Sequence, residues 1–164
     1  MTDTTAPRAL IGHTGFVGSN LAAQAPFDLT FNSANFRDMT GRHFSHLTCA
    51  GVQAVKWWAN RNPEEDRAGI AALEAVLATV TADAFTLIST VDVYPSPIGV
   101  DEGDIPPADG EPYGRHRRAF ELFVAERFPG AAIVRLPGLF GRGLKKNLVF
   151  DVLADRDLSG FDAR

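Results

Sequence analysis

Apolar and polar positions follow two different periods along the chain, and these periods predict strands and helices in turn. Short apolar runs typical of buried strands occupy residues 8–11, 29–32, 46–50, 84–89 and 131–136. Apolar residues recur at helical spacing in residues 16–25, 62–81 and 113–128. The second of these helices has a favourable start, with Asn62 as the N-cap and Pro63 at the first helical position. Strands that alternate with helices predict an α/β fold, a Rossmann-like doubly wound parallel sheet with helices on both faces.

The segment from Pro95 to Pro112 interrupts this alternation. It contains five prolines and three glycines, which exclude regular structure. Because it lies between the end of a strand and the start of a helix, it either borders an active site or forms a solvated surface loop.

The turn after the first strand is rich in glycine. Gly12, Gly15 and Gly18 have the spacing G-x-x-G-x-x-G between an apolar strand and a helical pattern. Such a turn brings backbone amides against a pyrophosphate at a helix N-terminus. Gly12 would permit the tight turn, Gly15 the approach of the phosphates, and Gly18 the packing of helix on strand. The sequence therefore predicts nucleotide binding here, with a plain strand-to-helix turn as the alternative.

Composition narrows the class of protein. The 164 residues carry a net charge of −4, and the charge pattern shows no basic face of the kind that binds nucleic acid. Cys49 is the single cysteine, which excludes an internal disulfide and fits a reducing compartment. Residues 1–7 lack the features of a signal peptide, and no apolar run approaches the ~20 residues that cross a bilayer. We expect a soluble cytoplasmic protein with no membrane contact and no metal site, built as one domain over residues 1–150 with a short tail at 151–164.

Three later motifs complete a pattern with the glycine turn. Residues 89–94 are Ser-Thr-Val-Asp-Val-Tyr, Tyr113 is followed four positions later by Arg117, and residues 135–141 are Arg-Leu-Pro-Gly-Leu-Phe-Gly. In this order they resemble the extended short-chain dehydrogenase/reductase superfamily, specifically its NAD-dependent epimerase/dehydratase branch, which modifies sugar nucleotides. The resemblance covers residues 8–147 and implies that residues 89–94 are the strand-five motif and residues 135–141 the strand-six motif.

The resemblance also implies catalytic roles. Tyr113 would be the acid/base that accompanies hydride transfer, and Thr90 would hold the reacting oxygen by a hydrogen bond. Arg117, at i+4 on the same helical face, would lower the pKa of Tyr113. Asp92 would be a further acid/base, as an acid at that place is in dehydratase relatives, or would instead cap the loop that follows.

Two positions depart from the family pattern. Arg117 stands where the family has lysine, and because arginine is effectively never deprotonated it supplies charge but relays no proton. The second strand ends at Asn32 and Ser33 without the acid that NAD-specific members use, and Arg37 follows closely. This composition favours NADP over NAD. The expected cofactor contacts are Gly12, His13, Thr14, Gly15, Phe16, Val17, Gly18, Asn32, Ser33, Arg37, Ala50, Gly51, Ser89, Tyr113, Arg117 and Pro137.

The sequence leaves more than one role open for Lys56, Trp57 and Trp58, which follow the Ala50-Gly51 turn. Lys56 is the unassigned lysine nearest the expected cofactor crevice and is a candidate replacement for the missing family lysine. Trp57 and Trp58 either stack on a substrate base or pack in the core or a subunit contact.

We therefore expect an NAD(P)-dependent oxidoreductase, epimerase or dehydratase that acts on a nucleotide sugar or a related alcohol or carbonyl. The substrate domain of full-length relatives is largely absent, so the chain is expected to be a short or truncated member. The alternative is a catalytically impaired dinucleotide-binding module that senses cofactor or serves as a scaffold. We also expect a homodimer, formed through the exposed faces of helices 63–81 and 113–128.

Overall fold

The sheet has five strands, all parallel. The computed structural model describes residues 6–141, 143 and 144, and in them the strand order is β2-β1-β3-β4-β5. The strands are β1 (Arg8–Ile11), β2 (Leu29–Phe31), β3 (His43–Cys49), β4 (Thr81–Thr90) and β5 (Ala132–Leu136). The predicted doubly wound α/β class is confirmed. The predicted domain boundary at 150 and the tail 151–164 lie outside the described residues.

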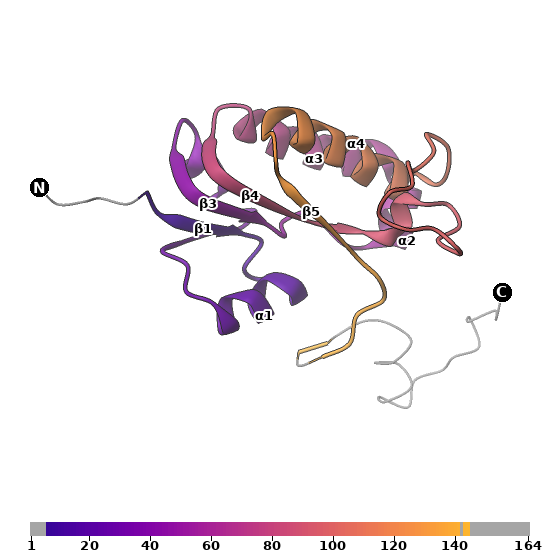
Figure 1. Ribbon diagram of the computed structural model, residues 1–164, viewed down its shortest axis with the longest axis horizontal. Helices are drawn as coiled ribbons and strands as arrows, with labels where there is room; N and C mark the ends of the chain where they lie inside the picture. Colours follow the sequence, from indigo (N-terminus) through magenta and orange to yellow (C-terminus); the bar gives the residue numbers. More distant parts are fainter. Residues whose placement is uncertain (1–5, 142, 145–164) are drawn as a thin grey trace, which may run out of the picture.

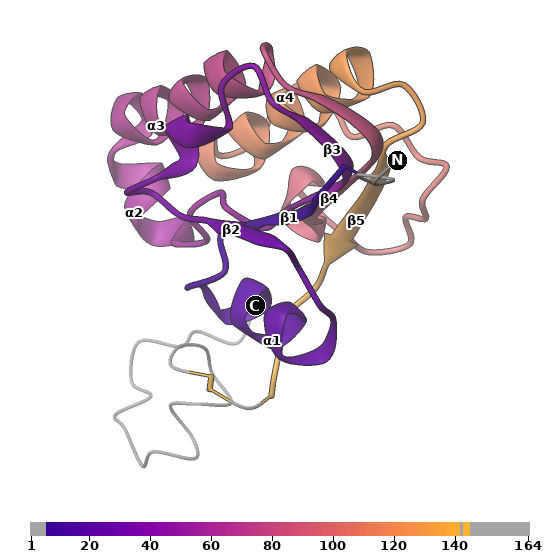
Figure 2. The same cartoon turned by 90° about the vertical axis from the view of Figure 1, so that its left-hand side faces the viewer.

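Helices cover both faces of the sheet (Figures 1 and 2). Helix α1 (Phe16–Gln24) lies on one face, and α3 (Pro63–Leu77) and α4 (Pro112–Arg127) lie side by side on the other. The short helix α2 (Lys56–Arg61) packs against both α3 and α4. Two 3-10 turns, η1 (Phe36–Met39) and η2 (Val91–Val93), follow β2 and β4.

The strand order determines where a ligand can bind. From β1 the chain crosses to β2 on one side and then returns to β3 on the other. The carboxyl ends of β1 and β3 therefore flank the point where the direction of winding reverses, and open α/β sheets bind ligands at that point.

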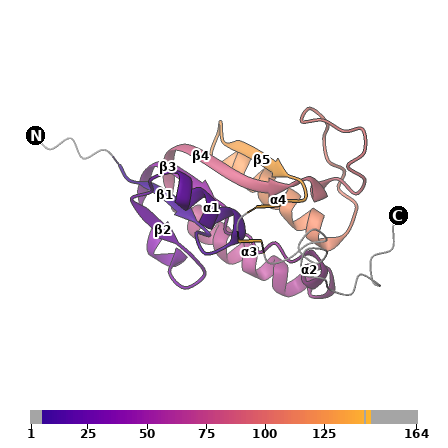
Figure 3. The same cartoon turned by 90° about the horizontal axis from the view of Figure 1, so that it is seen from below.

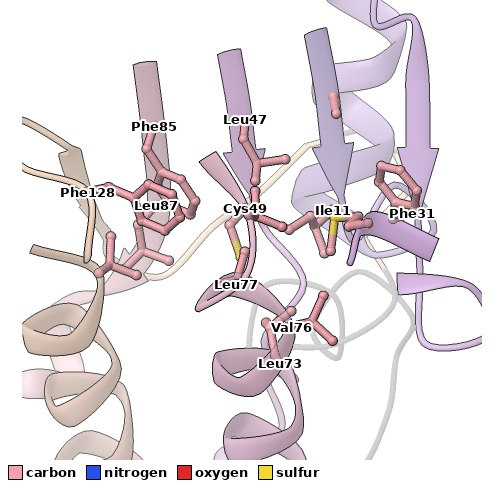
Figure 4. Packing of buried hydrophobic residues seen from close by; sticks show 14 of the residues in the cluster. Ile11, Phe31, Leu47, Cys49, Leu73, Val76, Leu77, Phe85, Leu87 and Phe128 are labelled. Atoms are coloured by element: carbon pink, nitrogen blue, oxygen red, sulfur yellow. The ribbon is translucent and has the colours of Figure 1, made fainter. Parts of the chain in front are cut away.

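The main core fills the space between the sheet and helices α3 and α4 (Figure 4). Leu47 and Cys49 of β3 and Leu87 of β4 face Leu77 of α3, and all four side chains are almost fully buried. Phe85 and Phe128 stack with ring centroids 4.3 Å apart, which fixes the end of α4 on β4. Burial raises the pKa of the Cys49 thiol to about 11, against a smaller lowering by a hydrogen bond to the Gly51 backbone, so this cysteine is an inert core residue.

Several predicted boundaries are corrected. The helix expected to reach residue 81 ends at Leu77, because the chain turns through hydrogen bonds from Thr79 N to Val76 O and from Val80 N to Leu77 O. The β-branched residues that follow start β4 instead. The strand expected at 46–50 begins at His43. Helix α2 was not predicted, because its six residues include two tryptophans and it has no side-chain N-cap.

The motifs assigned to strands five and six lie at the ends of β4 and β5, the fourth and fifth strands, because only η1 stands between β2 and β3. The loop between η2 and α4 extends beyond the carboxyl ends of the strands, near α2 and the start of α4 (Figures 1 and 3). None of the helices in the described part of the chain is both long and apolar enough to span a membrane.

Candidate functional site

The glycine turn joins β1 to α1 at the carboxyl edge of the sheet. Gly12 has φ +88°, a conformation that L side chains rarely adopt, and its N–H donates to Phe31 O at 2.7 Å. A methyl group at Gly12 would collide with the Ala50 carbonyl and lie 2.7 Å from Gly51 Cα. The turn and the Ala50-Gly51 segment after β3 are therefore in contact, which brings together two of the predicted cofactor-binding segments.

The fold requires a glycine at position 18 but not at position 15. A methyl group at Gly18 would collide with the Gly12 carbonyl and lie 3.0 Å from His13 Cα, so Gly18 permits α1 to pack on the turn. At Gly15 the nearest atom to such a methyl would be Gly12 O at 3.4 Å. The fold itself therefore leaves space at Gly15, at the exposed N-cap of α1.

The first intrahelical bond of α1 runs from Ser19 N to Gly15 O at 2.9 Å. By helix geometry the amides of Phe16, Val17 and Gly18 precede it and have no partner one turn back. Thr14 is exposed beside them, and His13 Nδ1 lies 3.0 Å from Phe31 O. This open helix start fits a phosphate group.

The end of β2 is a polar turn. Asn32 Oδ1 accepts from Ala34 N at 2.8 Å, so that side-chain oxygen stabilises the turn. Ser33 and Arg37 are exposed, and the Arg37 guanidinium lies 4.7 Å from the centre of the Phe36 ring. Of the predicted contacts near β2, Ser33 and Arg37 are the two whose side chains are accessible.

Tyr113, Thr90, Asp92 and Lys56 gather where β4 ends. Asp92 Oδ1 accepts from Lys56 Nζ at 2.9 Å, and Asp92 Oδ2 accepts from Thr90 Oγ1 at 3.2 Å. Asp92 N donates to Thr90 Oγ1 at 3.1 Å, so the side chain that caps η2 is that of Thr90. Tyr113 lies buried at the start of α4, and its N–H donates to Asn60 Oδ1 at 2.9 Å.

Burial raises the pKa of the Tyr113 phenol above its ordinary value. The Arg117 charge lowers this pKa, the Asp92 charge raises it, and the Thr90 hydrogen bond and the Lys56 charge lower it again. Burial acts to lower the pKa of Lys56, but the hydrogen bond and charge of Asp92 and the charge of Glu111 outweigh it, so the pKa is raised. Lys56 is therefore a stable cation beside this cluster.

Arg117 is held by Asp66 of α3. Its Nη1 donates to Asp66 Oδ2 at 2.5 Å and its Nη2 to Asp66 Oδ1 at 2.8 Å. Nη2 also donates to Gln53 O at 2.5 Å, and the guanidinium lies 4.0 Å from the centre of the Tyr113 ring. Arg117 is 4% exposed, so it acts on Tyr113 from the ring face while its hydrogen bonds go to the protein. His116 Nδ1 lies 2.7 Å from the same Asp66 carboxylate.

A second buried carboxylate, Glu121, was not predicted from the sequence. Glu121 is fully buried on α4 and accepts from Ser89 Oγ at 2.7 Å, from Arg118 Nη1 at 3.0 Å and from Arg135 Nε at 2.9 Å. The Ser89 hydroxyl thus donates to Glu121, although this residue was predicted to contact cofactor. Asp66 lies one helical turn before the apolar Ile70, and Glu121 stands between Phe120 and Leu122. An acid at such a place in a helix was the signal that could have revealed each cluster.

Arg135 also anchors the loop. Its Nη1 donates to the Tyr94 hydroxyl at 2.7 Å, and that hydroxyl donates to Asp104 O at 2.9 Å. One cavity of about 140 Å³ lies between the end of the loop and the site. It is lined by Asp109 and Glu111 from the loop and by the site residues Lys56 and Asp92. Of the two readings of the proline-rich loop, this arrangement supports the one in which it borders the site.

The remaining candidates lie at the margins. Trp57 is 63% exposed with Arg61 5.8 Å from its ring centre, whereas Trp58 is half-buried. Pro137 is exposed just after β5. In the part of the chain that the structure describes, no group of three or more His, Cys, Asp or Glu side chains could hold a metal ion.

No family model and no curated protein matches the chain. Solved structures do. RMD from Pseudomonas aeruginosa, complexed with NADPH, matches with a TM-score of 0.66 at 22% identity over 85% of this chain and 56% of that one. A dTDP-4-dehydrorhamnose reductase from Yersinia enterocolitica gives a TM-score of 0.73 at 15% identity over 90% and 59%. MoeE5, in complex with UDP-glucuronic acid and NAD, gives 0.66 at 20% identity over 93% and 62%.

The chain shares their fold. The predicted Rossmann-like class is thereby confirmed. The chain spans less than two thirds of the length of each of these three proteins.

Proposed function

We propose that the chain binds NAD or NADP across the carboxyl ends of β1 and β3 and takes part in hydride transfer to or from an alcohol or carbonyl. The observation that carries this proposal is the glycine turn. Gly12 and Gly18 are required by close packing, whereas a methyl group at Gly15 would make only an ordinary contact with Gly12 O at 3.4 Å. A small residue that the fold does not need, placed beside free helix amides, fits a bound phosphate.

The cofactor would be held by the turn and by the neighbouring segments. The amides of Phe16, Val17 and Gly18 would face the pyrophosphate, and Ala50 and Gly51 would lie beside the dinucleotide. When bound, such a cofactor accepts or donates hydride. The chain's own part is to exclude water and to move a proton at the substrate oxygen. Tyr113 would hold that proton and Thr90 would donate a hydrogen bond to the same oxygen.

The choice of cofactor follows from the end of β2. Ser33 and Arg37 are exposed there, and Asn32 stands where NAD-specific members have an acid. An exposed guanidinium pairs well with a phosphate on the ribose 2′ position. The site therefore favours NADP.

A nucleotide sugar is the proposed substrate class. The support is that MoeE5 was solved with a UDP-sugar and that the Yersinia protein is a dTDP-sugar reductase. The accessible aromatic Trp57, which follows Lys56 in α2, offers a surface on which a base can stack.

The buried Arg117–Asp66 pair favours a second candidate, a catalytically impaired dinucleotide-binding module. A guanidinium whose donors are taken up by Asp66 and the Gln53 carbonyl does not relay protons. In this candidate the turn binds cofactor but no substrate is converted.

Calorimetry with NADPH and NADH, followed by turnover assays with a panel of sugar nucleotides, tests the two candidates. We expect binding of the dinucleotide, and turnover that falls roughly a hundredfold or more in Tyr113→Phe. Binding without turnover would support the module. Well-folded protein that binds neither dinucleotide would refute both.

We also propose a homodimer through the outer faces of α3 and α4, where Leu122 is 54% exposed. A monomer by light scattering at high concentration would contradict it.

A further inference from the structure

Four side chains from three separate segments form a connected chain at the site. Lys56 begins α2, Thr90 and Asp92 come from the end of β4 and from η2, and Tyr113 stands in the first turn of α4. The two oxygens of Asp92 have different partners, Lys56 Nζ at 2.9 Å and Thr90 Oγ1 at 3.2 Å. Tyr113 lies beside these groups, since a methyl group at the adjacent Gly114 would meet the Asp92 carbonyl, and the Thr90 side chain acts to lower the pKa of the Tyr113 phenol.

The outer end of this chain reaches water. The side chains of Lys56 and Asp92 are 49% and 36% exposed, whereas Tyr113 is 6% exposed. Lys56 and Asp92 also line the cavity beneath the proline-rich loop. A buried phenol that must change its protonation state needs such a path, because it has little direct contact with solvent.

We propose that Thr90 and Asp92 carry protons between the Tyr113 hydroxyl and solvent, with Lys56 as a positioning residue that holds the Asp92 carboxylate in place. This inference rests on the proposed function, in which Tyr113 is the acid/base. Arg117 is not the relay, because its guanidinium stays protonated and its hydrogen bonds go to Asp66, Gln53 O and Tyr113 O.

The proton balance is simple. When a substrate alcohol is oxidised, its O–H bond breaks and the Tyr113 phenolate gains that proton. Tyr113 then passes its proton to Thr90 Oγ1, while the Thr90 hydroxyl proton moves to Asp92 Oδ2. The Asp92 carboxyl releases a proton to water and returns to the ion pair with Lys56. In carbonyl reduction each transfer runs backwards, and no electrons leave or enter the protein side chains.

The charges that face these groups act in known directions. Lys56 and Arg117 favour the Tyr113 phenolate, whereas Asp92 disfavours it. Lys56 itself faces Asp92, Glu111 and Tyr113. Removing Lys56 therefore has two effects, since it withdraws a positive charge from Tyr113 and releases Asp92 from its partner.

The ionisation of Tyr113 can be followed without substrate or cofactor. The chain has only two tyrosines, Tyr94 and Tyr113, so NMR of fluorotyrosine-labelled protein resolves them once Tyr113→Phe assigns the signals. The more acidic fluorophenol brings the titration below alkaline unfolding, which circular dichroism checks at each pH. We expect Lys56→Met and Thr90→Val to raise the Tyr113 pKa and Lys56→Arg to leave it close to wild type. The control Asp83→Asn, at the exposed amino end of β4, leaves it unchanged.

A double-mutant cycle separates a hydrogen-bonded chain from charge acting through space. If Thr90 connects Tyr113 to the ion pair, the effect of Lys56→Met on the Tyr113 pKa shrinks strongly when Thr90→Val is also present. Equal effects in both backgrounds would overturn the relay, because a charge acting through space does not need the hydroxyl. No effect of Lys56→Met in either background would overturn it as well.

Turnover gives the second measurement. We expect Asp92→Asn to lower kcat roughly a hundredfold with little change in KM, since proton transfer and not binding is lost. A kcat within about twofold of wild type would overturn the relay, since general acid–base steps contribute far more. Calorimetry with NADPH distinguishes failure of the relay from failure of the proposed function. If NADPH binds but the effect of Lys56→Met on the Tyr113 pKa does not depend on Thr90, the relay alone is refuted. If that dependence is found but no dinucleotide binds, the proposed function is refuted.

Discussion

Arg117 of α4 and Asp66 of α3 form a buried bidentate ion pair, with N···O distances of 2.5 and 2.8 Å. His116 also contacts the Asp66 carboxylate, and the Gln53 and Tyr113 carbonyls accept from Arg117. The pair locks together the two helices on one face of the sheet and sets the segment after β3 against α4. The cation four residues after Tyr113 is therefore part of the scaffold of the site.

Asp66→Asn is expected to destabilise the fold by about 3–5 kcal/mol, because it leaves a buried guanidinium without its counter-ion. Chemical denaturation measures the loss. The matched control is Glu65→Gln, the exposed neighbour in the same helical turn, which should change stability by less than about 0.5 kcal/mol. If the two variants lost equal stability, the ion pair would have no structural role.

Stability should also fall in acid because of Glu121. Burial acts to raise the pKa of this carboxyl, but hydrogen bonds from Arg135, Ser89 and Arg118 outweigh it and hold the pKa below its usual 4.5. A carboxyl with a depressed folded-state pKa adds stability above pH 4.5, and that stability is lost as the pH falls from 4.5 through the folded value.

Urea midpoints measured across this window test the effect. Glu121→Gln should be less stable than wild type at neutral pH and should show a flatter loss on acidification. A variant that follows the wild-type pH profile in parallel would mean that other carboxyls cause the acid loss.

The sequence was sufficient for the fold and for the glycine turn because both depend on local patterns. Strand β1 and the start of α1 were predicted at their observed first residues, since an apolar run followed by spaced glycines has few alternatives. The partners of Arg117 could not be predicted, because Asp66 lies 51 residues away and only the packing of α3 on α4 brings them together. The same holds for Ser89, whose hydroxyl meets Glu121 32 residues later.

The second and third glycines of the turn, Gly15 and Gly18, should respond differently to alanine. Gly18→Ala is expected to cost more than about 2 kcal/mol of stability, because the new methyl group meets the backbone of Gly12 and His13 and the backbone yields little. Gly15→Ala should keep the wild-type stability and lose dinucleotide affinity by roughly tenfold or more, since the methyl occupies the space proposed for phosphate. Thermal unfolding and calorimetry measure the two properties separately. Unchanged NADPH affinity in Gly15→Ala would place the phosphates elsewhere.

Tyr94 should control the order of the proline-rich loop. Its hydroxyl donates to Asp101 O at 3.1 Å and Asp104 O at 2.9 Å, and it accepts from Arg135 at 2.7 Å. Tyr94→Phe removes these contacts and keeps the ring, so we expect faster hydrogen exchange of loop amides and a loss of about 1–3 kcal/mol from the unpaired Arg135 donor. Exchange in β1 and β3 is the internal reference. Loop protection equal to wild type would show that the prolines alone order the loop.

Arg37 should decide between the two dinucleotides. Its guanidinium is exposed near the end of β2 and lies over the Phe36 ring, 4.7 Å from the ring centre. Within the described residues no carboxylate pairs with it, so it can meet a 2′-phosphate. Arg37→Ala should weaken NADPH binding by roughly tenfold, the loss of one charge-assisted contact, and leave NADH binding within about twofold. Arg8 is exposed at the opposite end of β1, and Arg8→Ala is the matched control, which should change the affinity for neither NADPH nor NADH.

Because the effect is electrostatic, added salt should shrink the difference in affinity between NADPH and NADH in the wild type and should hardly change it in Arg37→Ala. Equal losses for both cofactors in Arg37→Ala would mean that this arginine acts on the fold of the β2 turn and that specificity lies with other residues.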